Sequence, residues 1–298
     1  MKSVVVTGVS TGIGWGCAKV LIGQGFRVFG SVRKAADAER LRGEFGPNFT
    51  PLIFDVTDQA AVRAAADQVA ETLGDEPLAG LVNNAGVSIA GPLLHQPIAE
   101  FRAQIDVNLI GVVIVTQAFA PLLFRRAGAP GQPGRIVNIS SVGGRNGVPF
   151  LAPYCASKFA VEGLSESLRR ELMLFGVDVI IVAPGTVATA IWAKSDAADI
   201  GPYRQTAFFP ALERLRAFMN GGGGLAPEAL GALVAKALTT PRPRVRYTIA
   251  PDMIQTLMMA HLPRRMVDRM FGQRLGLLPD HQAAVADDQP GGGTPRIL

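Results

Sequence analysis

Apolar runs alternate with amphipathic segments along most of the chain. Short runs rich in Val, Ile and Leu, which we expect to form buried strands, lie at 3–8, 26–32, 50–56, 78–86, 134–141, 177–185 and 245–250. Helical patterns lie at 12–25, 36–46, 58–74, 98–126, 153–176 and from Pro227 onward, and Asp58 and Pro153 suit helix starts. Apolar strands that alternate with longer helices indicate a parallel sheet covered on both faces. The pattern therefore predicts a single doubly wound α/β domain over 1–250.

This alternation lapses after Gly185. Residues 188–224 are rich in large apolar side chains and end in four glycines, and we interpret them as a lid with a glycine hinge. Residues 251–279 mix apolar and basic positions, which predicts a helical C-terminal extension. Residues 280–298 have the composition of a mobile tail.

Composition narrows the functional classes. The chain has 298 residues, 48% hydrophobic and 18% charged, with a formal net charge of +5. Its basic residues form no dense stripe with interleaved aromatics, so we expect no nucleic-acid partner. The two cysteines, Cys17 and Cys155, lie singly inside predicted helices, so we expect neither a disulfide nor a metal site. A reducing, cytoplasmic location fits best.

One stretch is apolar enough for a membrane span. Residues 107–124 carry no charge, and a spanning helix is one interpretation of their length. However, the stretch contains Asn108, Thr116 and Pro121. We interpret it instead as a helix that is buried on most sides and lies at a subunit contact, with no integral membrane segment in the chain.

A glycine-rich turn follows the first strand. Gly8, Ser10, Thr11, Gly12, Ile13 and Gly14 lie between that strand and the next helix. Glycines let the backbone approach a phosphate closely, and a helix N-terminus supplies N–H donors for an anion. A plain turn has the same letters, but this position in an alternating α/β chain favours a nucleotide.

Tyr154 and Lys158 raise a different question, because a free tyrosine is a poor acid or base at neutral pH. Residues four apart share a helix face. An ammonium near a phenol lowers the pKa of the phenol, so we expect Lys158 to prepare Tyr154 for proton transfer. A surface pair on an amphipathic helix is the alternative.

Five separated motifs resemble those of the short-chain dehydrogenase/reductase family. They are the G-x-x-x-G-x-G turn at Gly8–Gly14, Asn83-Asn84-Ala85-Gly86, Asn108, the Ser141–Tyr154–Lys158 spacing, and Pro184-Gly185-Thr-Val187-Ala-Thr189. The resemblance covers roughly residues 3 to 250 and implies a Rossmann-type domain with a seven-stranded parallel sheet.

The resemblance implies specific residue roles. Ser141 would bind the substrate oxygen, Tyr154 would transfer the proton, and Asn108 would link Lys158 to solvent through a bound water. Lys158 would also bind the ribose hydroxyls of the cofactor. The other implied cofactor contacts are Asp55 and Val56 at the adenine, Asn84, Ala85 and Gly86 at the adenosine ribose, and Pro184, Gly185, Val187 and Thr189 near the carboxamide. The composition of the lid, rather than the resemblance, leads us to expect that Trp192 contacts the substrate.

The second strand indicates which cofactor binds. NAD enzymes place an acidic residue at its end to bind the ribose 2′-hydroxyl. Here the strand ends Val32-Arg33-Lys34, and Arg33 could hold a 2′-phosphate. The sequence therefore favours NADP over NAD.

These features together predict an NADP-dependent enzyme that interconverts an alcohol and a carbonyl. The second strand and the long C-terminal end resemble the retinol dehydrogenase and 17β-hydroxysteroid dehydrogenase branch. The large apolar residues of the lid predict a bulky apolar substrate. The uncharged stretch 107–124 and the helix of Tyr154 offer an apolar contact face, which predicts a homodimer. We expect the lid and Met253, Ile254, Leu257, Met258 and Met259 to line the substrate pocket, unless the lid residues merely pack. Arg264, Arg265 and Arg269 would face water or an anionic membrane in peripheral contact. A 3-oxoacyl thioester reductase and a non-catalytic nucleotide-binding redox sensor are the alternatives.

Overall fold

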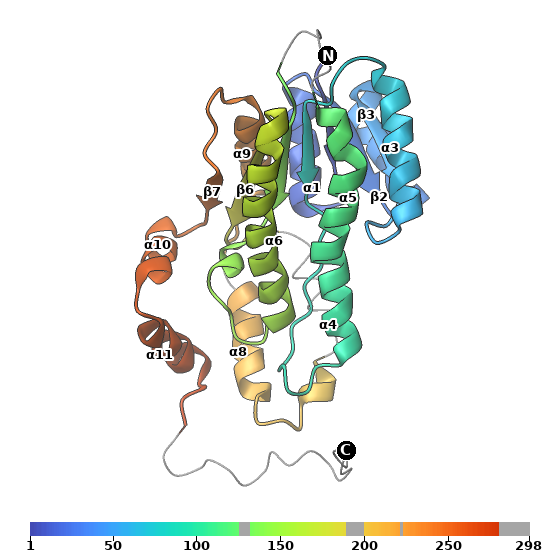
Figure 1. The fold of residues 1–298 in the computed structure, drawn as a ribbon. Coiled ribbons are helices and arrows are strands. Elements are labelled where there is room, and N and C mark those ends of the chain that lie inside the picture. Colours follow the sequence, from blue (N-terminus) through green and yellow to red (C-terminus); the bar gives the residue numbers. More distant parts are fainter. Residues whose placement is uncertain (125–131, 189–199, 221–222, 280–298) are drawn as a thin grey trace, which may run out of the picture.

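The computed structural model describes residues 1–124, 132–188, 200–220 and 223–279. Seven parallel strands form one sheet in the order β3-β2-β1-β4-β5-β6-β7 (Figure 1). The strands are β1 Ser3–Val6, β2 Arg27–Val32, β3 Phe49–Ile53, β4 Gly80–Asn83, β5 Arg135–Ile139, β6 Asp178–Pro184 and β7 Arg246–Ile249. The predicted doubly wound fold is confirmed.

Helices cover both faces of the sheet. On one face lie α1 (Gly12–Gly23), α2 (Ala35–Phe45) and α9 (Pro227–Thr239), and on the other lie α3 (Gln59–Leu73), α5 (Gly111–Phe119) and α6 (Ala152–Glu171) (Figure 1). Asp58 caps α3 by accepting a hydrogen bond from the Ala61 amide at 3.0 Å, as the sequence predicts. Pro153 lies in the first turn of α6, also as predicted.

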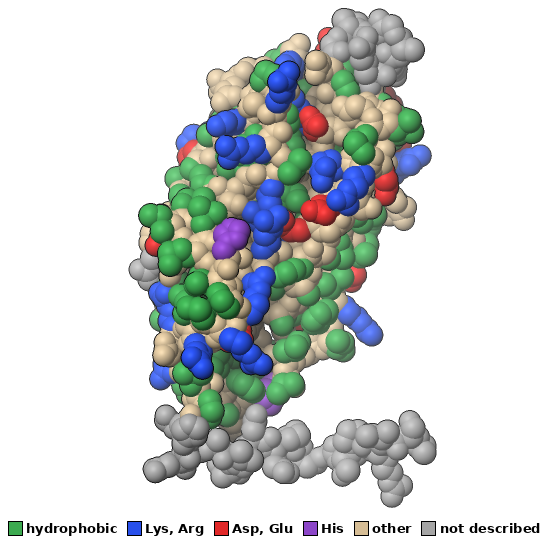
Figure 2. Space-filling model, turned by 60° about the vertical axis from the view of Figure 1, so that its left-hand side comes forward, with side chains coloured by type: hydrophobic (Ala, Val, Ile, Leu, Met, Phe, Trp, Pro, Cys, Tyr) green, Lys and Arg blue, Asp and Glu red, His purple; other side chains and the backbone are tan. Residues whose placement is uncertain are grey.

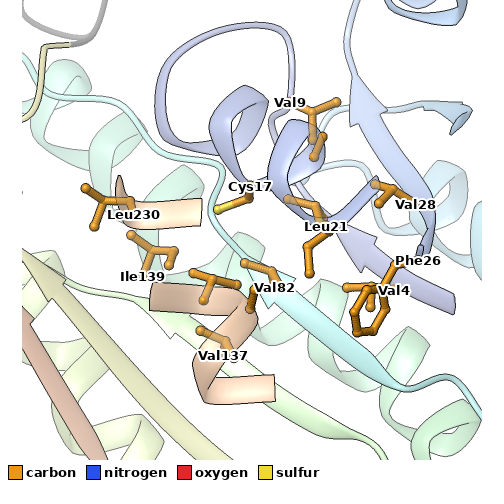
Figure 3. Close-up of a cluster of buried hydrophobic side chains, with 14 of the residues drawn as sticks. Val4, Val9, Cys17, Leu21, Phe26, Val28, Val82, Val137, Ile139 and Leu230 are labelled. Atoms are coloured by element: carbon orange, nitrogen blue, oxygen red, sulfur yellow. The ribbon is translucent and has the colours of Figure 1, made fainter. Parts of the chain in front are cut away.

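The strands are mostly apolar because each face of the sheet meets a helical layer. Val4 packs toward α1, where it meets Leu21 and Phe26 (Figure 3), while its neighbour Val5 belongs to the cluster on the opposite face. Successive side chains of a strand point to opposite faces of the sheet. Because helices cover both faces, Val4 and Val5 are both fully buried. Cys17 lies within the first cluster, and both cysteines are free and buried.

A buried polar network ties the layers together near the carboxyl end of β4. The amide nitrogen of Asn83 on β4 donates to Thr116 of α5 at 3.0 Å and to Asn138 of β5 at 2.8 Å. Asn138 donates in turn to Ser165 of α6 at 2.8 Å. Thr116 therefore fixes the long apolar helix against the sheet.

That helix consists of α4 (Ile98–Ile105), a π-helical turn (Asp106–Ile110), α5, and a 3₁₀ turn (Ala120–Leu123). By length and composition alone, Ile98–Leu123 could cross a membrane, and 39% of its most apolar window is buried. Val115, Phe119 and Leu123 pack against the sheet. Ile110, however, is exposed, so the helix is less enclosed than predicted.

In the described part of the chain, three further helices lie beyond the sheet. α8 (Phe209–Asn220) sits below α6 in Figure 1, while α10 (Met253–His261) and α11 (Arg264–Leu275) follow β7 at the left edge. Leu275 of α11 packs with Leu212 and Leu215 of α8, and the Leu275 carbonyl accepts a hydrogen bond from Arg214 at 2.9 Å. The C-terminal extension is therefore helical, as predicted, and its second helix is packed on α8.

Candidate active site

A cavity of about 480 Å³ opens at the carboxyl ends of the strands. Its lining includes residues that follow each of the first six strands: Gly8, Arg33, Asp55, Asn84, Ser140 and Gly185. The chain crosses from β3 to β4 on the far side of β1, so the strand order reverses between β1 and β4. Doubly wound sheets bind ligands in the crevice at this reversal.

The glycine-rich turn is shaped for close backbone approach. Gly8 and Gly12 have φ values of +70° and +63°, which only glycine adopts without strain. A methyl group at position 14 would lie 2.2 Å from the Gly8 carbonyl oxygen, so residue 14 must also be glycine. The Thr7 hydroxyl accepts hydrogen bonds from the amides of Asn84 and Ala85 at 2.9 and 3.0 Å, which joins this turn to the loop after β4.

The N-terminus of α1 faces this cavity. Thr11 holds the N-cap position, but its side chain makes no capping hydrogen bond. The first N–H groups of α1 are therefore available to an anion. Arg40 of α2 donates to the Ser10 carbonyl at 2.7 Å and so supports the turn, a contact that no sequence pattern indicated.

Arg33 lies at the cavity edge beyond the end of β2. Its side chain is mostly exposed, and its Nη1 lies 3.8 Å from Oδ2 of Asp55. Partial burial acts to raise the pKa of Asp55, but hydrogen bonds from Thr57 and the Arg33 charge outweigh it and lower that pKa. Arg33 is thus held loosely at the rim and has N–H groups to offer a ligand.

Ser141, Tyr154 and Lys158 converge on one side of the cavity. Ser141 follows β5, and its hydroxyl accepts a hydrogen bond from the Gly143 amide at 3.0 Å and is hydrogen-bonded to Tyr154. Tyr154 and Lys158 lie one turn apart on α6, with the lysine Nζ 5.8 Å from the centre of the tyrosine ring. Lys158 donates to the Ile139 carbonyl at 2.9 Å.

The predicted lowering of the Tyr154 pKa is wrong for the protein alone. Burial raises the pKa of Tyr154 to about 12, and the hydrogen bond with Ser141 offsets this only in part. Burial also lowers the pKa of Lys158 from 10.5 to about 8. The low-dielectric surroundings disfavour the charged form of each group.

Asn108 lies behind the residues that line the cavity. It is fully buried at the π-helical turn. Its side-chain oxygen accepts the Val87 amide at 2.8 Å, and its nitrogen donates to the Val87 carbonyl at 2.9 Å and to the Ser157 hydroxyl at 3.1 Å. Asn108 therefore fixes the loop after β4 against α6, and its role in a water relay stays a prediction.

Behind Ser141 lies a charged network that no sequence pattern indicates. Glu162, one turn beyond Lys158 on α6, accepts a hydrogen bond from the Ser140 hydroxyl at 2.8 Å. Arg246 of β7 binds the same carboxylate in a two-pronged contact at 2.9 and 3.0 Å. Arg145 lies 3.4 Å from it on the other side. This network holds the Ser141 turn against the helix that carries Tyr154, and only its three-dimensional arrangement reveals it.

The structure brings most predicted site residues to the cavity. The lining contains Gly8, Ser10, Thr11, Gly12, Ile13, Arg33, Asp55, Val56, Asn84, Ala85, Gly86, Ser141, Tyr154, Lys158, Pro184, Gly185 and Val187. Thr189 and Trp192 lie outside the described residues. The sequence analysis missed Val87, Ser88 and Ile89, although they directly follow the Asn83–Gly86 motif.

The described part of the predicted lid packs over Tyr154. Leu212 and Leu215 are buried with Phe150 and Leu151 in a cluster against which Tyr154 also packs. Phe208 meets the Phe150 ring edge-on, with ring centres 6.1 Å apart. For Leu212 and Leu215 the packing alternative therefore holds.

The predicted role of α10 is wrong. Met253, Ile254, Leu257, Met258 and Met259 are absent from the cavity lining. Ile254, Leu257 and Met258 are exposed. The physical reason is that α11, rather than α10, packs onto α8, which leaves α10 at the edge of the molecule.

Comparisons with known proteins agree with this geometry. A family model described as short chain dehydrogenase matches residues 2–199. The NADPH-dependent 3-dehydrocapnine reductase of Ornithobacterium rhinotracheale is 38% identical over 91% of this chain and 96% of its own length. Retinol dehydrogenase 7 of Rattus norvegicus is 35% identical over 91% of this chain and 87% of its own. A solved short-chain dehydrogenase from Streptomyces avermitilis superposes with a TM-score of 0.71 at 27% identity, covering 93% of this chain and 97% of that one.

Proposed function

Because this chain belongs to the short chain dehydrogenase family of oxidoreductases, we propose that it uses NADP(H) to interconvert an alcohol and a carbonyl group. The observation that carries the proposal is the convergence of Ser141, Tyr154 and Lys158 beside the glycine-rich turn in one cavity. An anion site and a proton-transfer group are thereby within reach of one bound molecule.

The cavity fits a dinucleotide on two grounds. The turn has no room for a Cβ atom at residue 14, and the N–H groups at the start of α1 lack a side-chain cap. Gly8–Ile13 would hold the pyrophosphate, Asp55 and Val56 would border the adenine, and Lys158 would bind ribose hydroxyls. When bound, the nicotinamide supplies or accepts the hydride.

The side chains then handle the substrate oxygen and its proton. Ser141 binds that oxygen by hydrogen bond and holds it near the Tyr154 hydroxyl, to which Ser141 is already bonded. Tyr154 donates its proton to the oxygen during reduction and accepts it during oxidation. The Lys158 ammonium stabilises the phenolate that is left after donation, since the two groups share one side of the cavity.

We propose NADP rather than NAD as the cofactor. β2 ends in Val32, so no carboxylate stands there to bind a ribose 2′-hydroxyl. Arg33 follows at the cavity rim and can hold a 2′-phosphate through paired N–H groups. The NADPH dependence stated in the name of the Ornithobacterium relative supports this choice.

We propose further that the substrate is bulky and apolar. Val87, Ile89 and Val107 give the cavity lining apolar side chains, and the buried cluster of Phe150, Leu151, Tyr203 and Leu212 packs beside Tyr154. Pockets for apolar ligands are lined in this way. A retinoid or steroid carbonyl is the class proposed, in keeping with the name of the Rattus relative.

The test is turnover with a substrate panel. Consumption of NADPH is measured with retinoid and steroid carbonyls, a chain-length series of ketones, and a 3-oxoacyl thioester. We expect kcat/KM to rise with apolar bulk. Highest activity with the thioester would favour a 3-oxoacyl thioester reductase. Cofactor binding without turnover of any carbonyl or alcohol would favour a non-catalytic sensor.

We also propose a cytoplasmic homodimer. Both cysteines are free and buried, which suits a reducing compartment. Ile110 on the long helix and Phe159 on α6 are exposed apolar side chains that a two-fold axis could pair. Light scattering at micromolar concentration tests the assembly, and a stable tetramer would contradict it.

A further inference from the structure

The helix α10 exposes an apolar face that the described part of the chain does not bury. Its Ile254, Leu257 and Met258 lie three and four residues apart and so share one side of the helix. Ile254 is 75% exposed and Met258 56%. No residue of α10 is buried. The apolar face of α10 therefore points outward, and packing against the described core does not account for its apolar side chains.

The neighbouring helix α11 extends this face. Val267 and Leu275 are buried, and Leu275 packs against α8. Met266 and Met270, four residues apart on another side, are exposed, as is Leu278 beyond the helix end. Five of the eight methionines of the chain lie between residues 253 and 270. Their flexible side chains adapt to irregular apolar partners.

The same region carries the positive charge of the protein. Residues 242–278 contain seven arginines and two aspartates, an excess of five that equals the formal net charge of the whole chain. Arg265 and Arg269 on α11, and Arg242 and Arg244 before β7, are exposed. Figure 2 brings this side of the molecule forward and shows basic and hydrophobic side chains interleaved on it.

We propose that α10 and α11 dock the protein onto an anionic lipid bilayer. The exposed apolar side chains would enter the boundary between headgroups and acyl chains, and the arginines would contact anionic headgroups. A second copy of this chain fits the face poorly, because a two-fold axis would place arginines near arginines. An anionic bilayer complements both the charge and the apolar surface.

Docking at this face would bring the lipid close to the substrate site. Leu275 of α11 packs on Leu212 of α8, and that cluster includes Tyr154 at its edge. The contact between α11 and α8 therefore connects this face to the cluster beside Tyr154. The binding itself does not depend on catalysis, so its test is independent of the proposed reaction.

The first experiment is vesicle flotation with the full chain. We expect the protein to float with vesicles of phosphatidylcholine and phosphatidylglycerol, and to stay at the bottom with phosphatidylcholine alone. The double variant Leu257→Ser/Met258→Ser should lose flotation. Its control, Met173→Ser/Leu174→Ser, removes side chains that are 67% and 82% exposed after α6 and should float like the wild type.

The second experiment tests the charge. Arg265→Gln/Arg269→Gln should lower the partition coefficient about fivefold for each arginine removed, and added salt should weaken wild-type binding. The control Arg63→Gln/Lys236→Gln removes two exposed charges from α3 and α9 and should have little effect. NADPH binding by each variant verifies that it is folded.

Three results would overturn the proposal. One is a wild-type protein that fails to float with the anionic vesicles at low salt. Another is flotation that survives either the serine pair or the glutamine pair. The third is a lower solution mass for the Leu257→Ser/Met258→Ser variant than for the wild type, because this would show that a second copy of the chain covers the face in the wild type.

Discussion

Replacing Lys158 with methionine should stabilise the cofactor-free protein while it abolishes turnover. The lysine is buried, and burial lowers its pKa from 10.5 to about 8. At pH 7 the folded protein therefore holds a charge that its surroundings disfavour. Methionine fills similar space without that charge, but it cannot bind ribose hydroxyls or stabilise a phenolate.

The size of the effect follows from the pKa shift and one hydrogen bond. A fall in pKa from 10.5 to about 8 corresponds to about 3 kcal/mol of folding free energy, at ~1.4 kcal/mol per pKa unit. Methionine also leaves the Ile139 carbonyl without its donor at 2.9 Å, which costs about 1 kcal/mol. The net gain is about 2 kcal/mol, or roughly 4 °C in melting temperature for a chain of this size.

The pKa values of Lys158 in the folded and unfolded states determine how the stability difference between the two proteins changes with pH. The unfolded chain keeps the ordinary lysine pKa of 10.5, so between about pH 8 and 10.5 it binds a proton that the folded protein does not. Stability of the wild type relative to Lys158→Met therefore rises with pH across this window. Thermal melts of both proteins without cofactor, from pH 6.5 to 9.5, should show the advantage of the variant shrinking above pH 8.

Two outcomes would refute the reasoning. A variant less stable than the wild type at pH 7 would mean that the Lys158 hydrogen bond outweighs the buried charge. An advantage that stays constant up to pH 9.5 would mean that the charge is not its cause. Lys236→Met provides the control, because Lys236 is exposed on α9 and should show neither the gain nor its pH dependence.

Three further substitutions test the site. Tyr154→Phe should lower kcat by ~10²–10⁴ while NADPH binding, followed by fluorescence, is retained, and near-normal turnover would remove Tyr154 from the reaction. Arg33→Ala should raise KM for NADPH roughly tenfold or more with little change for NADH, since it removes a charge-assisted contact worth about 1.5–3 kcal/mol; an unchanged ratio of the two KM values would contradict the phosphate contact. Glu162→Gln should lower kcat through loss of Ser141 positioning and leave KM for NADPH unchanged, whereas Glu166→Gln, one turn further along α6 and exposed, should have no effect; equal kcat values for the two variants would disprove the positioning role.

The sequence alone determined the fold. The central strands of the sheet are covered on both faces and are therefore mostly apolar, and such runs are visible without coordinates. Asp58 shows the same for local structure, because a helix cap depends only on residues next to it in the chain. The glycine turn and the Tyr154–Lys158 pair were equally visible, since a turn at a helix start and a spacing of four on one helix are local features.

Tertiary structure decided how the site residues are tuned. The pKa of Tyr154 depends on what surrounds the ring in space, and burial raises it although a lysine lies four residues away. Glu162 meets Ser140 and Arg246, which are 22 and 84 residues away in sequence. No spacing rule connects such positions, because only the packing of β5, α6 and β7 brings them together.

The C-terminal helices show the same division between what the sequence determines and what the tertiary structure decides. Their composition predicted helices with apolar and basic positions, and that prediction is confirmed. Composition does not tell which apolar positions are buried, so it places Met253, Ile254, Leu257, Met258 and Met259 equally well in the pocket wall or at the surface. In the structure α11 packs on α8, and Ile254 and Met258 of α10 are exposed to solvent. Amphipathic sequence fixes that a helix has an apolar face, whereas the partner of that face depends on where the rest of the chain leaves room.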